Sequence, residues 1–116
     1  MALVKLNRFN GNKAGAVYDI AVAVNEKGIA YIEDYKNHFM LQLLSGNAIR
    51  IKNMDEFSSE FVSSLALYEK KNAAAHKDVH VCRDNITAIL PAQGSGYDIG
   101  FTNNQVSLTV KTLDPL

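Results

Sequence analysis

Two histidines and the one cysteine of the chain stand close together in the sequence. His76, His80 and Cys82 are ligand types suited to zinc or copper, and on a strand His80 and Cys82 would share a face. A structural zinc site takes four ligands, and this spacing matches no common zinc signature. We therefore expect no metal and no other cofactor, with these three residues as the weak candidates for a metal site.

A second group of residues could carry acid–base chemistry. Glu33, Asp34 and His38 are near one another in the sequence, so that a carboxylate could orient an imidazole. The chain has no Gly-x-Ser-x-Gly motif, and the glycine-rich residues 94–96 lack the Lys-Ser/Thr that follows in a phosphate-binding loop. We expect a protein that is not an enzyme. A metal protein or enzyme that uses His80 and Cys82 is the weaker alternative.

Basic and aromatic side chains on the expected strands indicate a third chemistry. Tyrosine rings stack on single-stranded bases, and lysine and arginine bind phosphates. Against this, Glu33 lies between the two tyrosines, and the twelve basic and twelve acidic side chains cancel. Single-stranded nucleic-acid binding is therefore the alternative function, with these candidate contacts: Lys5, Arg8, Tyr31, Tyr35, Arg50, Lys52 and Lys111.

Most of the chain has the alternating apolar pattern of strands, broken by turn residues. The predicted strands are residues 3–9, 16–25, 29–35, 39–44, 48–52, 78–82, 86–90, 97–101 and 106–111. Short turns between them favour antiparallel pairing. Two hairpins have clear inward sets, which are Phe39, Leu41, Leu43, Ile49 and Ile51 in one and Tyr97, Ile99, Phe101, Val106, Leu108 and Val110 in the other.

Between the two hairpins the pattern changes to a helical period. Phe57, Phe61, Leu65 and Tyr68 are spaced by four, four and three residues, which is one stripe of a helix. Asn53, followed by Glu56, has the residue types of a capping box. The sequence predicts a helix over about residues 54–72, with Phe57, Phe61 and Leu65 buried against the sheet.

The apolar pattern also repeats. Residues 22–32 match residues 79–89 without a gap, and residues 49–55 match residues 108–114. We expect a single α+β domain over residues 1–116, built from two degenerate β-meander units, about 22–55 and 79–114, with the helix between them. Similar units have similar faces to bury, against each other or a second subunit, so we expect a homo-oligomer, most simply a dimer.

Length and composition set the remaining limits. A chain of 116 residues with 47% apolar residues is large enough for one domain with one core. No apolar run approaches the ~20 residues of a membrane-spanning helix, and charge interrupts the first residues, unlike a signal peptide. One cysteine rules out an internal disulfide. We expect a cytoplasmic or virion-associated protein that does not contact membranes.

The first half resembles a known family of small proteins. Its opening residues 4–11, the segment 29–32 and the hairpin 41–51, followed by an acidic helix start, resemble the short β-meander proteins of the flagellar FlbD-like type. Residues 11–23 and the second unit depart from that pattern, so a flagellar role does not carry over. The order of strands, one helix and more strands is similar to the Whirly and PC4-like single-strand-binding folds, as a topological analogy.

Taken together, these features favour a non-catalytic binding or assembly module that acts through protein–protein contacts. The sequence does not identify the protein partner.

Overall fold

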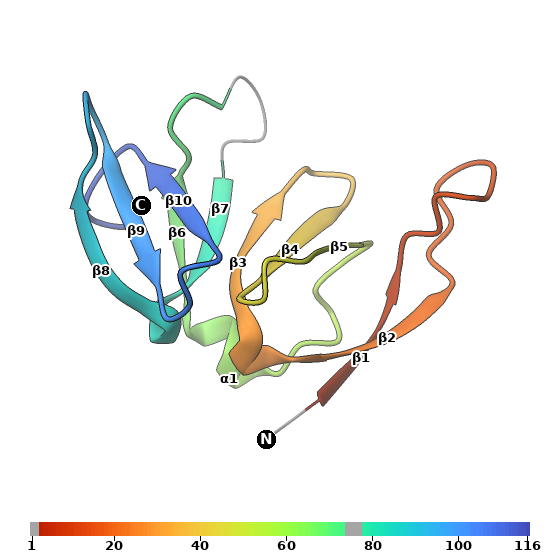
Figure 1. The fold of residues 1–116 in the computed structure, drawn as a ribbon. Helices are drawn as coiled ribbons and strands as arrows, with labels where there is room; N and C mark the ends of the chain where they lie inside the picture. Colours follow the sequence, from red (N-terminus) through yellow and green to blue (C-terminus); the bar gives the residue numbers. More distant parts are fainter. Residues whose placement is uncertain (1–2, 74–77) are drawn as a thin grey trace.

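The computed structural model describes residues 3–73 and 78–116, which form ten strands and one short α-helix (Figure 1). No helix in this described part is long and apolar enough to cross a membrane. The elements are β1 (Leu3–Arg8), β2 (Ile20–Asn25), β3 (Ile29–Asp34), β4 (Phe39–Leu43), β5 (Ala48–Ile51), α1 (Ser59–Ser63), β6 (Leu65–Glu69), β7 (Asp78–Cys82), β8 (Ile86–Pro91), β9 (Tyr97–Phe101) and β10 (Ser107–Val110), with 3-10 turns at Glu26–Gly28 and Arg83–Asn85.

The strands form two antiparallel sheets. One has seven strands in the order β2-β1-β5-β4-β3-β7-β6, and the other has three in the order β10-β9-β8. A bridge between Lys70 and Val110 joins the end of β6 to β10, and Lys111 N–H donates to the Glu69 carbonyl over 3.0 Å. The α+β class and the predicted strands before and after the predicted helix are confirmed.

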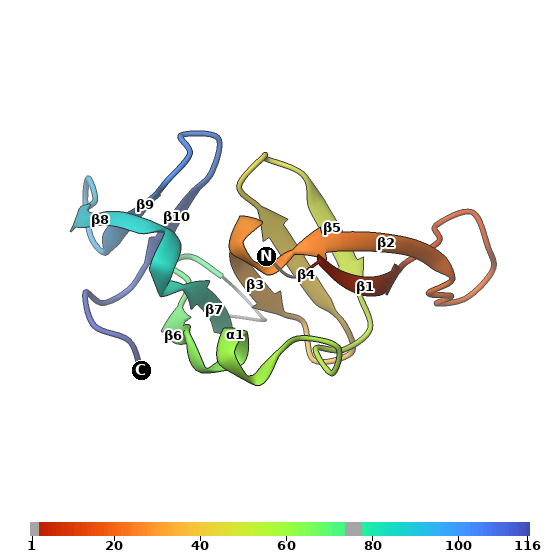
Figure 2. The ribbon, with the colours of Figure 1, turned by 90° about the horizontal axis from the view of Figure 1, so that it is seen from below.

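The buried side chains form two clusters rather than the single core expected from chain length. The first core contains Leu6, Val24, Ile29, Ile32, Leu41, Ile51, Phe57, Phe61 and Cys82. The second core contains Ala30, Tyr31, Ala66, Tyr68, Val79, Val81, Ile99, Phe101, Val106, Leu108 and Val110. The inward sets of both hairpins are confirmed, one in each core. The expectation of one core was wrong, because the first core draws mostly on residues 6–61 and the second mostly on residues 66–110. Figure 2 shows β8, β9 and β10 on one side of the molecule and β1, β2 and β5 on the other.

Strand β3 lies between the two cores and belongs to both. Ile29 and Ile32 are in the first core, whereas Ala30 and Tyr31 are in the second. A bulge between Ile29 and Tyr31 makes this possible, because an extra residue shifts the alternation of side chains by one. Four successive residues are consequently buried, three of them with an exposed fraction of 0%.

The long helix predicted over residues 54–72 is not present. The structure has a five-residue helix, α1, and then the strand β6, which pairs with β7 over five residues. The helical stripe is divided, since Phe57 and Phe61 enter the first core while Tyr68 enters the second. The run Leu65–Glu69 also fits a strand with apolar side chains on both faces. Hydrogen bonding to the edge of β7 favours the strand over the helix.

The helix cap also differs from the prediction. Ser58, not Asn53, caps α1, and its Oγ accepts a hydrogen bond from Phe61 N–H over 3.1 Å. The Glu26 carboxylate accepts hydrogen bonds from the Ser58 N–H and hydroxyl, which ties the first 3-10 turn to the start of α1. Arg83 donates to the carbonyls of Ser63 and Ser64 at the other end. These contacts satisfy backbone groups at the two ends of α1. A helix over residues 54–72 would have its ends at other residues.

Burial of Phe61 yields a stability prediction. Its exposed fraction is 8%, so Phe61→Ala should lower the free energy of unfolding by about 3–5 kcal/mol, through lost burial and a cavity. Val62→Ala is the matched control, because Val62 is 45% exposed, and its effect should stay within about 0.5 kcal/mol. Urea unfolding followed by circular dichroism measures both. Equal effects of the two variants would contradict the placement of Phe61.

Candidate functional site

The structure divides the predicted basic stripe between faces and sheets. Alternation along β1 and β5 puts Lys5 and Arg50 on one face of the seven-stranded sheet and Arg8 on the other, because Arg8 pairs with Ile51. Lys52 lies in the bend that directly follows β5. Lys111 follows β10 in the three-stranded sheet, where its ammonium is 2.7 Å from Glu69 Oε2. The seven candidates therefore do not form one continuous patch.

Arg50 has the most unusual surroundings of these residues. Its guanidinium carbon lies 4.5 Å from the centre of the Phe9 ring, a cation–π distance. Its Nε is buried and has no hydrogen-bond partner within the described residues. This part of the sheet therefore combines a cation, an aromatic ring and an unsatisfied donor.

The two candidate tyrosines lie in different environments. Tyr31 is buried, its ring centre 5.9 Å from that of Phe101, and burial raises its pKa to about 12, with the charge of Glu33 adding to the effect. A buried ring has no free face for a base. The Tyr35 ring stacks on His38 at 5.0 Å, and its hydroxyl donates to Glu33 Oε2 over 3.4 Å. Tyr35 thus remains as a candidate for stacking, and Tyr31 does not.

The acid–base candidates make contacts of a structural kind. Glu33 Oε2 is 2.7 Å from the Lys70 ammonium, a pair that joins β3 to the residue after β6. His38 Nδ1 is 2.7 Å from Asn37 Oδ1. These contacts stabilise the neighbouring strand ends.

Within the described residues, which include His80 and Cys82, no metal-ligand set is formed. No group of three His, Cys, Asp or Glu side chains in residues 3–73 and 78–116 is arranged to hold a metal ion. His76 lies outside the described residues. Cys82 is buried, and this raises the pKa of its thiol to about 12, with smaller contributions from the charges of Asp84 and Glu26.

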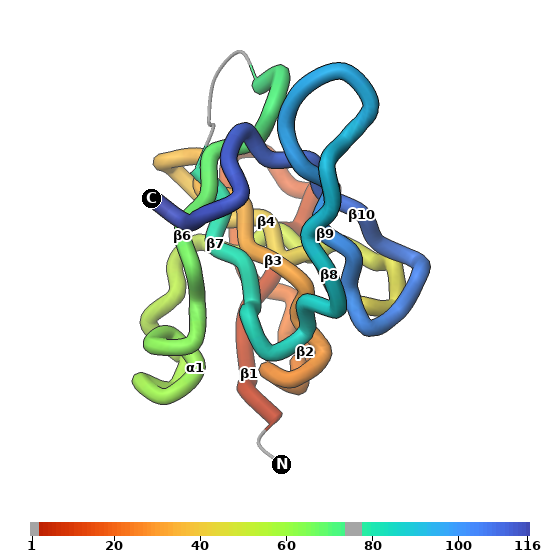
Figure 3. Tube along the Cα trace, turned by 90° about the vertical axis from the view of Figure 1, so that its left-hand side faces the viewer, coloured from red at the N-terminus to blue at the C-terminus, as the bar shows by residue number. Residues whose placement is uncertain are grey.

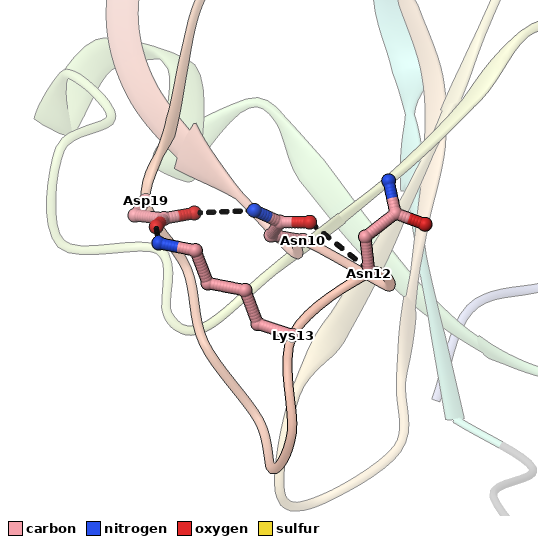
Figure 4. A network of polar contacts seen from close by, with 4 residues as sticks. All are labelled: Asn10, Asn12, Lys13 and Asp19. Carbon is pink, nitrogen blue, oxygen red and sulfur yellow. Dashed lines mark hydrogen bonds and ion pairs between the residues drawn. The ribbon is translucent and has the colours of Figure 1, made fainter.

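The loop between β1 and β2 holds a polar network, drawn in Figure 4. Asn10 Nδ2 donates to Asp19 Oδ1 over 3.1 Å, and Asn10 Oδ1 accepts from the Asn12 N–H over 3.0 Å. Lys13 forms an ion pair with the other oxygen of Asp19. The hydrogen bond from Lys13 holds the pKa of Asp19 below its ordinary value. The side chains of Asn10, Lys13 and Asp19 and the backbone N–H of Asn12 thus bond to one another and link both ends of this loop.

Strand β8 offers a different kind of site. It pairs with β9 on one side and, within the described residues, with no strand on the other. Its sequence, Ile-Thr-Ala-Ile-Leu-Pro, carries no charge, and Thr87, Ala88 and Leu90 are exposed, Leu90 by 61%. Natural sheet edges usually carry charges, proline or a covering segment that prevents a further strand from adding. Here Pro91 occupies the last position, so that residues 86–90 are open to pairing.

Strand β2 is a second open edge, and it belongs to the seven-stranded sheet, at the end opposite β6. It pairs with β1 and, in the part of the chain that the structure describes, with no other strand. It also lacks charged residues, and Ala21 and Ala23 are exposed. Figures 1 and 2 place β2 and β8 toward opposite ends of the molecule, whose longest dimension is 41 Å.

Sequence reasoning missed these two edges. It predicted both strands, but which strands are outermost depends on pairing between distant segments. The one available signal was the absence of charge in residues 20–24 and 86–90, a feature that the interior strand β4 and the strand β10 share. Figure 3 views the molecule from the side on which β8 lies.

Comparisons with protein-family models, with curated proteins and with solved structures find no match for this chain. The resemblance to FlbD-like proteins and the analogy to Whirly and PC4-like folds stay predictions.

The environment of Cys82 predicts low reactivity. At pH 8 a thiol with a pKa of about 12 has roughly a thousandfold less thiolate than an ordinary cysteine, and burial also blocks reagents. We expect slow reaction of the native protein with Ellman's reagent and rapid reaction in denaturant. A native rate close to the denatured rate would contradict the burial of Cys82.

Proposed function

We propose that this protein is a non-catalytic assembly module that associates with other protein chains by adding a strand to β8. The observation that carries the proposal is the uncharged, apolar outer edge of β8, with Leu90 61% exposed. An added strand would satisfy the outward backbone groups of β8 and cover its exposed side chains.

We further propose that the chain consists of two copies of one five-stranded unit, β1–β5 and β6–β10. The sequence match aligns Asn25 with Cys82 and Ile51 with Val110. Asn25 pairs with Leu3 and Cys82 with Leu65, while Ile51 pairs with Arg8 and Val110 with Lys70. Leu3 and Arg8 are as far apart along the chain as Leu65 and Lys70, so the proposed units would share their pairing register.

The bulges support the same proposal. One lies between Ile29 and Tyr31 where β3 meets β4, and the other between Ile86 and Ala88 where β8 meets β9. The sequence match aligns Ile29 with Ile86 and Tyr31 with Ala88. The proposed units begin earlier than the repeat expected from sequence, because β1 and β6 are included.

In this scheme β8 corresponds to β3, and the two strands differ in what covers them. Ile29 to Ile32 are buried, and β7 pairs with the outer edge of β3. At the corresponding positions of β8, Thr87 and Ala88 are exposed. The proposed contact would therefore give β8 a pairing strand on its outer edge, as β7 is for β3.

Charge on the β8 edge tests the proposal. We expect the wild-type protein to self-associate at tens of micromolar and the variant Ala88→Lys/Leu90→Lys, called the β8 variant below, to be monomeric. Both sites are exposed, so the variant should fold, whereas burying two ammonium groups in an interface is costly. Light scattering gives the mass, and circular dichroism confirms folding.

The matched control is Val62→Lys/Leu113→Lys, which adds the same charge at two other exposed apolar residues. It should associate as the wild type does. A monomeric wild type, or equal association of the β8 variant and wild type, would refute self-assembly through β8.

Single-stranded nucleic-acid binding is a second candidate, and the surroundings of Arg50 favour it. Arg50 lies over Phe9, has an unsatisfied buried Nε, and shares its face of the sheet with Lys5, and Lys52 follows two residues later in the chain. These groups could bind phosphates and stack a base.

Fluorescence anisotropy with a short labelled oligonucleotide at low salt tests this candidate. If binding occurs, Arg50→Gln and Lys52→Gln should each reduce the salt slope by about 0.7. Lys111→Gln is the control, since Lys111 is paired with Glu69 on the other sheet. Absence of binding at low salt, where attraction is strongest, would remove this candidate.

A further inference from the structure

We infer that the strand which adds to β8 is β2 of a second copy of this chain, so that copies associate head to tail. The inference rests on the proposed function and names the partner of the same edge. Its basis is the pairing of β7 with β3, which joins the two halves within one chain.

The β3–β7 ladder supplies the register. Tyr31 lies opposite Val81, Ile32 opposite His80, and Glu33 opposite Val79. In the two-unit scheme, β8 takes the place of β3 and β2 takes the place of β7. The same ladder between two copies would therefore be antiparallel, with Ala88 opposite Val24, Ile89 opposite Ala23 and Leu90 opposite Val22 of the second copy.

The side chains of the two edges suit this register. Val24 and Val22 belong to the first core or pack against it, so Ala88 and Leu90 would extend that core in the second copy. Tyr31 and Val81 lie together in the second core in the same way. Neither β2 nor β8 carries a charge that would have to be buried, and alanine at position 23 leaves room beside Ile89.

The positions of the edges decide the symmetry. β2 and β8 lie toward opposite ends of the molecule (Figure 1), so one copy cannot pair its own two edges. A contact between two different surfaces is heterologous, and repetition gives a ring or an open chain. This differs from the two-fold dimer that the sequence favoured, in which a strand would pair with its own copy.

A capture experiment separates these arrangements. The β8 variant keeps its β2 edge, so a tagged β8 variant should retain untagged wild-type protein on a resin, through β2 of the variant and β8 of the wild type. The tagged β8 variant should not retain untagged β8 variant. If wild type self-associates through β8 but the β8 variant captures none of it, the contact is β8 with β8 and the inference is wrong.

Cysteine cross-linking tests the register. Leu90→Cys and Val22→Cys proteins, mixed and oxidised, should form a disulfide-linked heterodimer as the main product, because directly opposite residues in a ladder are within disulfide range. The native Cys82 is buried and should not react. Leu90→Cys mixed with Ala23→Cys is the control for register, since a shift of one residue turns the side chain to the other face.

The outcomes distinguish the two proposals. Cross-linking of Leu90→Cys protein with itself would indicate a two-fold contact through β8 and overturn the head-to-tail inference, while assembly through β8 would stand. Cross-linking of Val22→Cys protein with itself would indicate a two-fold contact through β2 and overturn both the inference and assembly through β8. Efficient cross-linking in the Ala23→Cys control would overturn the register. A monomeric wild type would instead refute the proposed function.

Discussion

The pairing of β3 with β7 is the interaction on which the rest of the structure depends. It is the ladder that joins the strands before α1 to those after it in the seven-stranded sheet. Because a bulge lets β3 contribute to both cores, the ladder lies where the two apolar clusters meet. Loss of this pairing would expose fully buried residues of β3 and β7 together, including Ile32, Val79 and Val81.

Local pattern was sufficient to predict most strands but not the segment between the hairpins. Period-two alternation identifies β4, β5, β9 and β10 because each has one face on a core. The run Leu65–Glu69 satisfies helical and strand spacing equally well, and its conformation depends on a partner strand that is distant in the sequence. The strand identity of β6 was therefore not available from local pattern.

The candidate sites show the same limit. Residue type identified Arg50 and Tyr35 as candidate nucleic-acid contacts and Cys82 as a candidate metal ligand. Only the fold shows that Cys82 is buried and that Arg50 lies on Phe9. The open edges of β2 and β8 depend on strand order, which follows from pairing between distant segments. Sequence can indicate that an edge lacks charge, but it does not state which strands are edges.

The segment between β5 and β6 acts as a tether for the β3–β7 ladder. It is anchored by Phe57 and Phe61 in the first core and by the contact of Glu26 with Ser58. A short tether holds the two halves at an effective concentration that can reach about the millimolar range. At lower protein concentrations the halves of one chain should therefore find each other first. At very high protein concentrations during refolding, β7 of one chain can compete with β7 of another for pairing with β3. Domain-swapped dimers would then form.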